Sequence, residues 1–248
     1  MTRVRFGTVW VDSLTFAGAL DAIERLVEAG RGGAVFTPNV DHVVTAESNS
    51  AFREAYANAS LSLVDGQPLV WASRLLGSPL PEKISGADLV DPLLARAGQH
   101  GWRVFLVGGA PGCAKAAAQR FAAAHGVQVV GIEDGWIDLA EGPEGDALVA
   151  RIQEAQPRLV LVALGAPKQE LWIASRRQRI APAVCLGVGA ALDFAAGAVR
   201  RAPRWMQRAG LEWLYRLVQE PRRLARRYLW NDPRFLAVLL RTLASRSG

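Results

Sequence analysis

The sequence predicts an α/β fold built on a parallel sheet with helices on both faces, and two observations predict it. Between residues 102 and 199, short apolar runs alternate with alanine-rich helical patterns, as strands and helices do around a parallel sheet. The chain has 248 residues, of which 50% are apolar and 21% charged. It is therefore long enough for one large domain, or for one domain with an appendage.

The N-terminal half follows this pattern less regularly than the rest. The spacing of apolar residues predicts a helix over 16–29 and a second helix over 40–57. Two short apolar runs, at 34–36 and 61–64, are expected to be strands. The second run leads directly into Asp65.

The C-terminal half contains three β-α units, in which a glycine-rich turn follows each apolar run. The expected strands are 102–107, 159–164 and 184–188, and the helices after the first two should end near His125 and Arg179. We therefore expect residues 1–199 to form a Rossmann-like parallel-sheet core.

Past residue 200 the pattern becomes amphipathic and rich in arginine. Over 204–219, polar residues recur at every fourth position, which predicts one amphipathic helix stopped by Pro221. A second helix is expected after it, and Asn231-Asp232-Pro233 should break the chain before a third at 235–243. We therefore expect a helical appendage over residues 200–248.

This appendage carries the basic charge of the chain. It holds twelve arginines against three acidic residues, a charge of +9, whereas the whole chain carries +6. Aromatic residues stand among the arginines, so the appendage suits an anionic surface of phospholipid, diphosphate or nucleic acid. A simpler interpretation also stays open, because the apolar stripe of an amphipathic helix usually packs on a core or on another subunit.

Composition disfavours several classes of protein. Cys113 and Cys185 suit buried thiols in a reducing cytoplasm, since two unclustered cysteines make neither a disulfide framework nor a zinc pattern. The N-terminus lacks the features of a secretory signal, and no uncharged apolar run reaches about 18 residues, so any membrane contact should be peripheral.

His42, His100 and His125 have no metal-ligand spacing and are expected at the surface or at helix ends. Neither a metal nor another cofactor is expected, and no D-x-D motif is present.

Two glycine-rich turns could meet a nucleotide. Gly108 and Gly109 stand between a strand and a helix, where backbone N–H groups favour anions, although a plain tight turn is almost as well supported. Gly187 and Gly189 form a second turn of this kind. Neither turn completes a dinucleotide fingerprint, which disfavours an NAD-dependent oxidoreductase.

Polar residues also follow the two N-terminal strands. Thr37 and Asn39 come after one strand and Asp65 after the next, so they should lie at the carboxyl edge of the sheet, where open α/β folds bind ligands. Each could instead cap the following helix, and position alone slightly favours capping. For Asp65, the other interpretation is a general base.

Lys168 and Gln169 occupy the first turn of a predicted helix. A lysine is unfavourable beside the positive end of a helix dipole, so a nearby anion would explain Lys168 better than solvent would. Asp193 follows the turn at 187–189, where it could cap a helix or bind a ribose or base, and we weigh these two equally.

Six segments in this order carry a likeness to a known family: Thr37-Pro38-Asn39, Val64-Asp65-Gly66, Ser85-Gly86-Ala87-Asp88, residues 165–170 (GAPKQE), Gly187-Val188-Gly189, and the run from Arg201 to Arg223. Together they resemble the bacterial WecG/TagA/CpsF glycosyltransferases. The likeness covers nearly the whole chain, and its C-terminal run is the most specific part.

The resemblance implies an inverting, metal-independent transfer of a sugar from a UDP-sugar to a polyprenyl-diphosphate-linked acceptor. The sugar would be N-acetylmannosamine, its uronic acid or a hexose, and the product a cell-surface polysaccharide or a teichoic-acid linkage unit. The resemblance further implies a cytoplasmic enzyme, peripheral on the inner face of the membrane, whose appendage docks on the anionic surface and completes the active site.

The resemblance also implies roles for single residues. Asp65 is the expected base, Thr37 and Asn39 orient the acceptor sugar, and Gln169 and the segment 187–193 lie along the nucleotide-sugar. Arginines of the appendage would meet the diphosphate or the membrane. The candidates are Arg204, Arg208, Arg216, Arg222, Arg223, Arg226 and Arg227.

The rival interpretation is a nucleic-acid-binding protein, in which arginines and aromatic residues of the appendage grip phosphates and stack on bases. It explains the appendage but leaves Thr37, Asp65 and Lys168 without a role, so nucleic acid is not the expected partner. A homo-oligomer is compatible with the sequence.

Overall fold

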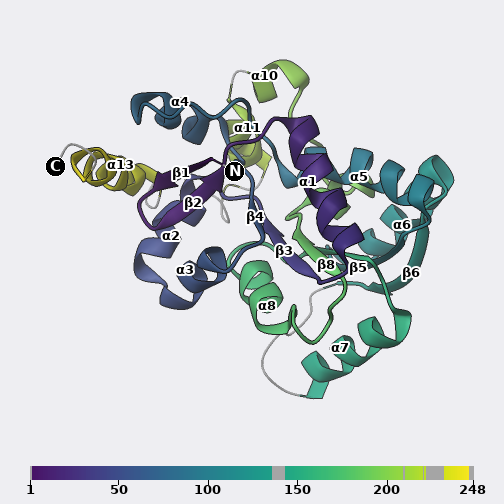
Figure 1. The fold of residues 1–248 in the computed structure, drawn as a ribbon. Helices are drawn as coiled ribbons and strands as arrows, with labels where there is room; N and C mark the ends of the chain where they lie inside the picture. The colour runs from purple at the N-terminus through teal and green to yellow at the C-terminus, as the bar shows by residue number, and fades with distance from the viewer. Residues whose placement is uncertain (1, 136–142, 209, 220, 222–231, 246–248) are drawn as a thin grey trace.

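The computed structural model describes residues 2–135, 143–208, 210–219, 221 and 232–245. Six strands form one sheet in the order β4-β3-β8-β7-β5-β6, and every neighbouring pair is parallel (Figure 1). The strands are β3 (Gly33–Phe36), β4 (Leu61–Ser62), β5 (Arg103–Gly108), β6 (Gln128–Glu133), β7 (Leu159–Ala163) and β8 (Val184–Gly187). The α/β fold and the five expected strands are confirmed.

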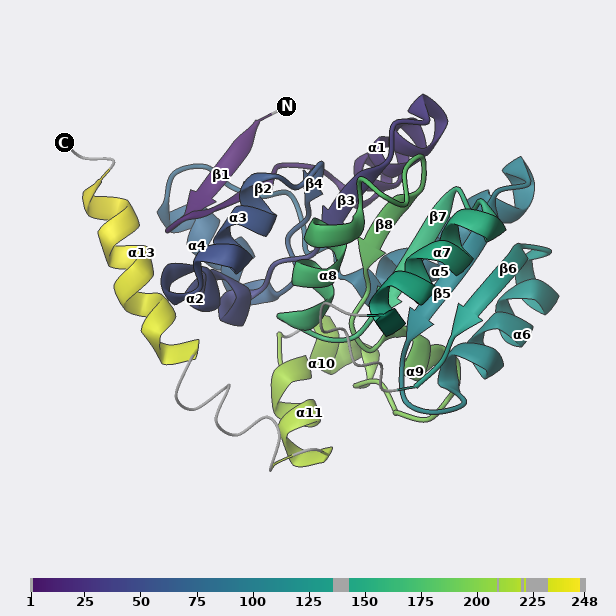
Figure 2. The same ribbon diagram turned by 90° about the horizontal axis from the view of Figure 1, so that it is seen from below.

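The central strands are buried on both faces, which explains their continuous apolar runs. Ala34 and Phe36 contribute to one hydrophobic core, and Val35 to the other. Figure 2 shows the strands in a row from β3 through β8, β7 and β5 to β6. One face carries α1 (Phe16–Ala29), α5 (Gly86–His100), α6 (Cys113–His125) and α9 (Ala191–Ala195), and the other carries α3 (Ser50–Ala57), α7 (Pro143–Ala155) and α8 (Lys168–Arg176).

The single helix expected over 40–57 is wrong, because it is two helices, α2 (Val40–Ser48) and α3. Asn49 between them is extended, with φ −111° and ψ 104°, and its side chain accepts from the backbone N–H of Phe52 at 3.0 Å. A residue within the helical pattern therefore caps a second helix. Three strands were also left unidentified by the pattern: β6 and the antiparallel hairpin of β1 (Arg3–Phe6) and β2 (Val9–Asp12).

The order of the strands creates a crevice at the carboxyl edge of the sheet. After β5 the chain adds β6 on one side, whereas after β7 it adds β8 on the other side. The connections therefore diverge between β5 and β7, and open α/β sheets bind ligands outside the carboxyl ends of strands at such a point.

The first helix of the C-terminal segment is interrupted. The structure has α10 (Arg204–Arg208) and α11 (Glu212–Gln219) where one helix was expected, and Gly210 between them has φ +71°. A left-handed residue ends a right-handed helix, so the expectation of a continuous helix is wrong. Gly210 also packs closely on α4 (Gln67–Leu75), since a Cβ there would lie 3.2 Å from the Trp71 ring.

The last helix, α13 (Phe235–Ala244), packs on the N-terminal part of the chain. The backbone N–H of Gly7 donates to Thr242 Oγ1 at 2.9 Å, and the rings of Phe6 and Phe235 lie 6.4 Å apart. A short 3-10 helix, Asp232–Arg234, precedes it, so the α-helix starts at residue 235, as expected. The second expected helix falls in 222–231, outside the described residues.

Candidate active site

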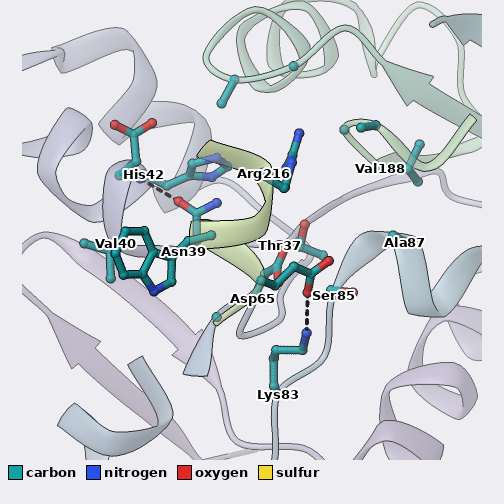
Figure 3. Close-up of a pocket in the computed structure, with 18 of the residues that line it drawn as sticks. Thr37, Asn39, Val40, His42, Asp65, Lys83, Ser85, Ala87, Val188 and Arg216 are labelled. Carbon is teal, nitrogen blue, oxygen red and sulfur yellow. Dashed lines mark hydrogen bonds and ion pairs between the residues drawn. The ribbon is translucent and has the colours of Figure 1, made fainter. Parts of the chain in front are cut away.

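A cavity of about 880 Å³ lies at the carboxyl ends of the strands and is bordered by α11. Its walls include Thr37 and Asn39 after β3 and Asp65 after β4 (Figure 3). Gly109 after β5 is also part of the wall. Loops after β7 and β8 complete the sheet side, and α11 contributes Glu212, Trp213 and Arg216. The structure therefore gathers eight of the predicted site residues around one cavity: Thr37, Asn39, Asp65, Gly109, Gln169, Gly189, Asp193 and Arg216.

Asp65 has the most perturbed carboxyl of this cavity. Its pKa is raised from 3.8 to about 7, first because burial disfavours the charged form and then because Glu212 and Asp88 are negative. Lys83 and Arg201 oppose this rise in pKa. The capping interpretation is wrong for Asp65, because the N-cap of α4 is Gly66 and no side chain caps that helix.

Four charged side chains form a cluster beside Asp65. Lys83 Nζ donates to Glu212 Oε2 at 3.2 Å and lies 3.9 Å from Asp88 Oδ2. Arg201 donates to Asp88 Oδ1 at 2.6 Å and to Glu212 Oε1 at 3.3 Å. Both carboxylate oxygens of Glu212 are thus bound by cations, which fixes the start of α11 against the cavity wall.

Asn39 and Thr37 both line the cavity, but only Asn39 also caps a helix. Asn39 Oδ1 accepts from the backbone N–H of His42 at 3.3 Å, so the capping interpretation is confirmed for Asn39, although the residue also lines the cavity. Thr37 is buried and lines the cavity beside Ser85.

Carboxylates of the protein occupy the turn that opens α6. The N–H of Ala110 donates to Asp193 Oδ1 at 2.8 Å, and the N–H groups of Gly112 and Ala114 donate to Asp134 at 2.7 and 3.1 Å. Gly109 donates its N–H to Ala163 O at 2.9 Å. A phosphate at this turn would meet two carboxylates and no unused N–H of these four, so the structure favours the plain tight turn.

The two glycines of this turn differ in their relation to the cavity. Both have φ +88°, but Gly109 lines the cavity whereas Gly108 packs on the sheet, where a Cβ would lie 2.6 Å from Ala163 O. Asp193 both holds the turn and borders the cavity.

Gln169 reaches across the end of β8 to the second glycine turn. Its Oε1 accepts from the Gly189 N–H at 3.1 Å, and its Nε2 donates to Glu170 Oε1 at 2.7 Å. Gln169 is buried and lines the cavity, whereas Lys168 is exposed and is not part of its lining. The structure therefore does not bring Lys168 to the site.

His42 lies in the same buried group, so the expectation of a surface or capping histidine is wrong for it. Its Nδ1 lies 2.7 Å from the Tyr56 hydroxyl and 4.0 Å from Glu170 Oε1. The pKa of Tyr56 is raised well above its ordinary value by burial, with added repulsion from Glu170 and Asp65, so the phenol stays protonated. No local pattern marked His42, because its partners lie on α3 and α8.

Arg216 is the candidate arginine of the C-terminal segment that the structure places at the cavity. Its guanidinium lies 5.9 Å from the Phe194 ring, and its buried Nε has no hydrogen-bond partner among the described residues. Arg204 and Arg208 lie in α10, but their side chains are not among those that the structure describes. Arg222, Arg223, Arg226 and Arg227 fall wholly outside the described residues.

A protein-family model matches almost the whole chain. The model described as "Glycosyl transferase WecG/TagA/CpsF family" matches residues 4–248. Within the described part of the chain, no helix is both long enough and apolar enough to cross a membrane.

Proposed function

The chain belongs to the WecG/TagA/CpsF family of glycosyltransferases, which act in cell-surface polysaccharide synthesis, and from this premise we propose its reaction. It transfers a sugar with inversion from a UDP-sugar to a polyprenyl-diphosphate-linked acceptor, without a metal. The sugar is N-acetylmannosamine, its uronic acid or a hexose. The observation that carries this proposal is the carboxyl of Asp65, whose pKa of about 7 suits a general base at neutral pH.

In the proposed step, Asp65 acts on the acceptor. The acceptor hydroxyl oxygen attacks the anomeric carbon from the face opposite the diphosphate, while its proton passes to the Asp65 carboxylate. The new glycosidic bond forms as the bond from the anomeric carbon to the diphosphate oxygen breaks. The electron pair of that bond leaves with UDP, so the configuration at the anomeric carbon inverts.

Arg216 is suited to meet the diphosphate that leaves. Lys83 and Arg201 also lie near Asp65, but both already pair with carboxylates. A buried guanidinium nitrogen in the wall of a cavity, with no partner among the described residues, favours an anionic ligand. Arg216 would therefore bind the diphosphate and stabilise the charge that develops on it.

The nucleoside would lie near the turn at Gly109 and near Asp193. Two carboxylates disfavour phosphate there, whereas hydroxyl and imide N–H groups can donate to a carboxylate oxygen. Gln169 and the segment 187–193 would run along the nucleotide-sugar toward Asp65, and Thr37 and Asn39 would orient the acceptor sugar.

Docking on an anionic membrane would bring the lipid-linked acceptor to the cavity. Exposed apolar side chains of α10, α11 and α13 support this proposal, since they lie beside arginines in an amphipathic segment. The side chains are Trp205, Trp213, Leu214, Val218, Leu236 and Leu240.

The test is release of UDP, with EDTA present, from a panel of UDP-sugars given a short-chain polyprenyl-diphosphate-linked N-acetylglucosamine. Release that requires the acceptor and occurs with one donor would establish the reaction and the sugar. If no UDP-sugar releases UDP but the protein still binds UDP, the acceptor is a different one. If no UDP-sugar releases UDP and the protein does not bind UDP, the assignment of a UDP-sugar donor is overturned.

A further inference from the structure

The side-chain amide of Gln169 has a single orientation that satisfies its surroundings. Its Nε2 lies 2.7 Å from Glu170 Oε1, and its Oε1 lies 3.1 Å from the backbone nitrogen of Gly189. The carboxyl oxygen of Glu170 accepts a hydrogen bond from the amide, and a backbone N–H can only donate one. The reversed amide would place oxygen against oxygen and N–H against N–H, so Glu170 Oε1 and the Gly189 N–H together determine which end of the amide faces Gly189.

The amide also fits closely against β8. A Cβ at Gly187 would lie 3.0 Å from Gln169 Nε2 and 3.2 Å from its Cδ, which is closer than carbon atoms normally approach. A residue without a side chain at position 187 therefore lets Gln169 lie across the strand end. Gln169 then ties the first turn of α8 to the turn at Gly189, and both line the cavity.

Glu170 is itself held in the core and does not line the cavity. The imidazole of His42 approaches it from α2, with Nδ1 4.0 Å from the same Oε1 that binds Gln169. The hydroxyl of Tyr56 in turn lies 2.7 Å from His42 Nδ1. Glu170 thus has a fixed position under the site, next to two residues that line the cavity, Gln169 and His42.

We propose that Glu170 is a positioning residue for the nucleotide donor, which acts by orienting the Gln169 amide so that its oxygen holds the Gly189 N–H. The turn at Gly189 then keeps the shape that receives the nucleoside diphosphate. This inference rests on the proposed UDP-sugar donor, but the orientation of the amide does not.

The first test is E170Q, which keeps the shape of the side chain and removes its fixed role as acceptor. With an amide at position 170, Gln169 can reverse, and Gly189 can lose its acceptor. We expect the dissociation constant of UDP, measured by calorimetry, to rise about tenfold, which is the usual effect of losing one hydrogen bond such as that between the Gly189 N–H and Gln169 Oε1. The KM of the donor should rise by a similar factor, with a smaller change in kcat, because Glu170 does not touch the reacting atoms.

A matched rescue is the double variant Q169E/E170Q, which exchanges the two groups. The amide at 170 would donate to one oxygen of the carboxylate at 169, whose other oxygen would accept from the Gly189 N–H. The exchange rate of the Gly189 N–H should return to that of the parent, because this N–H regains a fixed acceptor. Because this variant keeps one buried carboxylate and one amide, it also serves if E170Q alone fails to fold.

Amide hydrogen exchange at Gly189, followed by NMR without ligand, separates the two proposals. Faster exchange in E170Q and parental exchange in the double variant would support positioning by Glu170, even if the parent protein bound no UDP. Failure of the parent to bind UDP would overturn only the donor assignment. Unchanged exchange at Gly189 in folded E170Q, or a folded double variant that exchanges as fast as E170Q, would overturn the positioning role.

Discussion

Glu212 Oε2 lies 3.2 Å from Lys83 Nζ, although the two residues are 129 positions apart in the sequence. This ion pair joins α11 of the C-terminal segment to the loop before α5, at the edge of the cavity that contains Asp65. Glu212 raises the pKa of Asp65 and Lys83 lowers it. The position of α11 and the protonation of Asp65 are therefore coupled.

The pH profile should show this coupling. Because Asp65 must be deprotonated to act as a base, kcat/KM should fall as pH decreases through about 7. E212Q removes a negative charge near Asp65 and releases Lys83 from its ion pair with Glu212, and both effects lower the pKa of Asp65. The acidic limb of the pH profile, in which kcat/KM falls, should therefore move to lower pH. The control is E47Q, since Glu47 pairs with Arg241 and does not line the cavity. If the apparent pKa of the acidic limb were unchanged or higher in E212Q, the coupling would be contradicted.

Substituting the base should stabilise the fold at neutral and higher pH. The raised pKa means that Asp65 stays protonated in the folded protein up to about pH 7 but ionises near pH 3.8 when unfolded. Stability is therefore lost as pH rises from about 4 to about 7. At pH 8, D65N should raise the free energy of unfolding by roughly 1–4 kcal/mol while lowering kcat by about a hundredfold or more. Chemical denaturation at pH 4, where the gain in stability should vanish, is the internal control.

Removal of the guanidinium at the cavity should slow the chemical step. R216A takes away the cation proposed to stabilise the leaving diphosphate, so kcat should fall about a hundredfold. The KM of the acceptor should change little, because the cation acts on the donor. R241A removes an exposed arginine from α13 and should retain most of the activity. Equal losses in the two variants would indicate a general effect of charge in the C-terminal segment.

Exposed apolar residues of α10 and α11 should contribute to membrane binding. Trp205 is 63% exposed and Val218 is 76% exposed, so neither substitution should disturb the core. The variant W205A/V218A should bind vesicles of phosphatidylglycerol about tenfold more weakly in a sedimentation assay. W10A removes an exposed tryptophan of β2 and serves as the matched control. Binding by W205A/V218A equal to that of W10A would exclude this surface.

The sheet was predictable from the sequence because its central strands are buried on both faces. Burial of this kind leaves a continuous apolar run, such as β7, whose beginning and end are visible in the sequence. The strand β6 was missed because its first residue, Gln128, is exposed and its other residues are half-buried, so its pattern is mixed. The breaks at Asn49 and Gly210 were missed because a helical pattern of apolar residues continues through both.

The candidate site was predictable where its residues follow strand ends, as Thr37, Asn39 and Asp65 do. Parallel strands bring such residues to one edge of the sheet whatever the length of chain between them. His42, Lys83 and Glu170 could not be found in this way. Their roles depend on contacts between different elements, such as His42 with Tyr56 and Lys83 with Glu212, which no local spacing records.

The packing of α13 on β1 has a consequence for the order of events during synthesis. The hydrogen bond from Gly7 to Thr242 joins residues separated by 235 positions, so it can form only after Thr242 has been synthesised and has left the ribosome. Phe235, at the start of α13, also lines the cavity. The sheet can assemble while translation continues, but this wall of the cavity is built last, and a nascent chain therefore acquires its fold before it acquires a complete site.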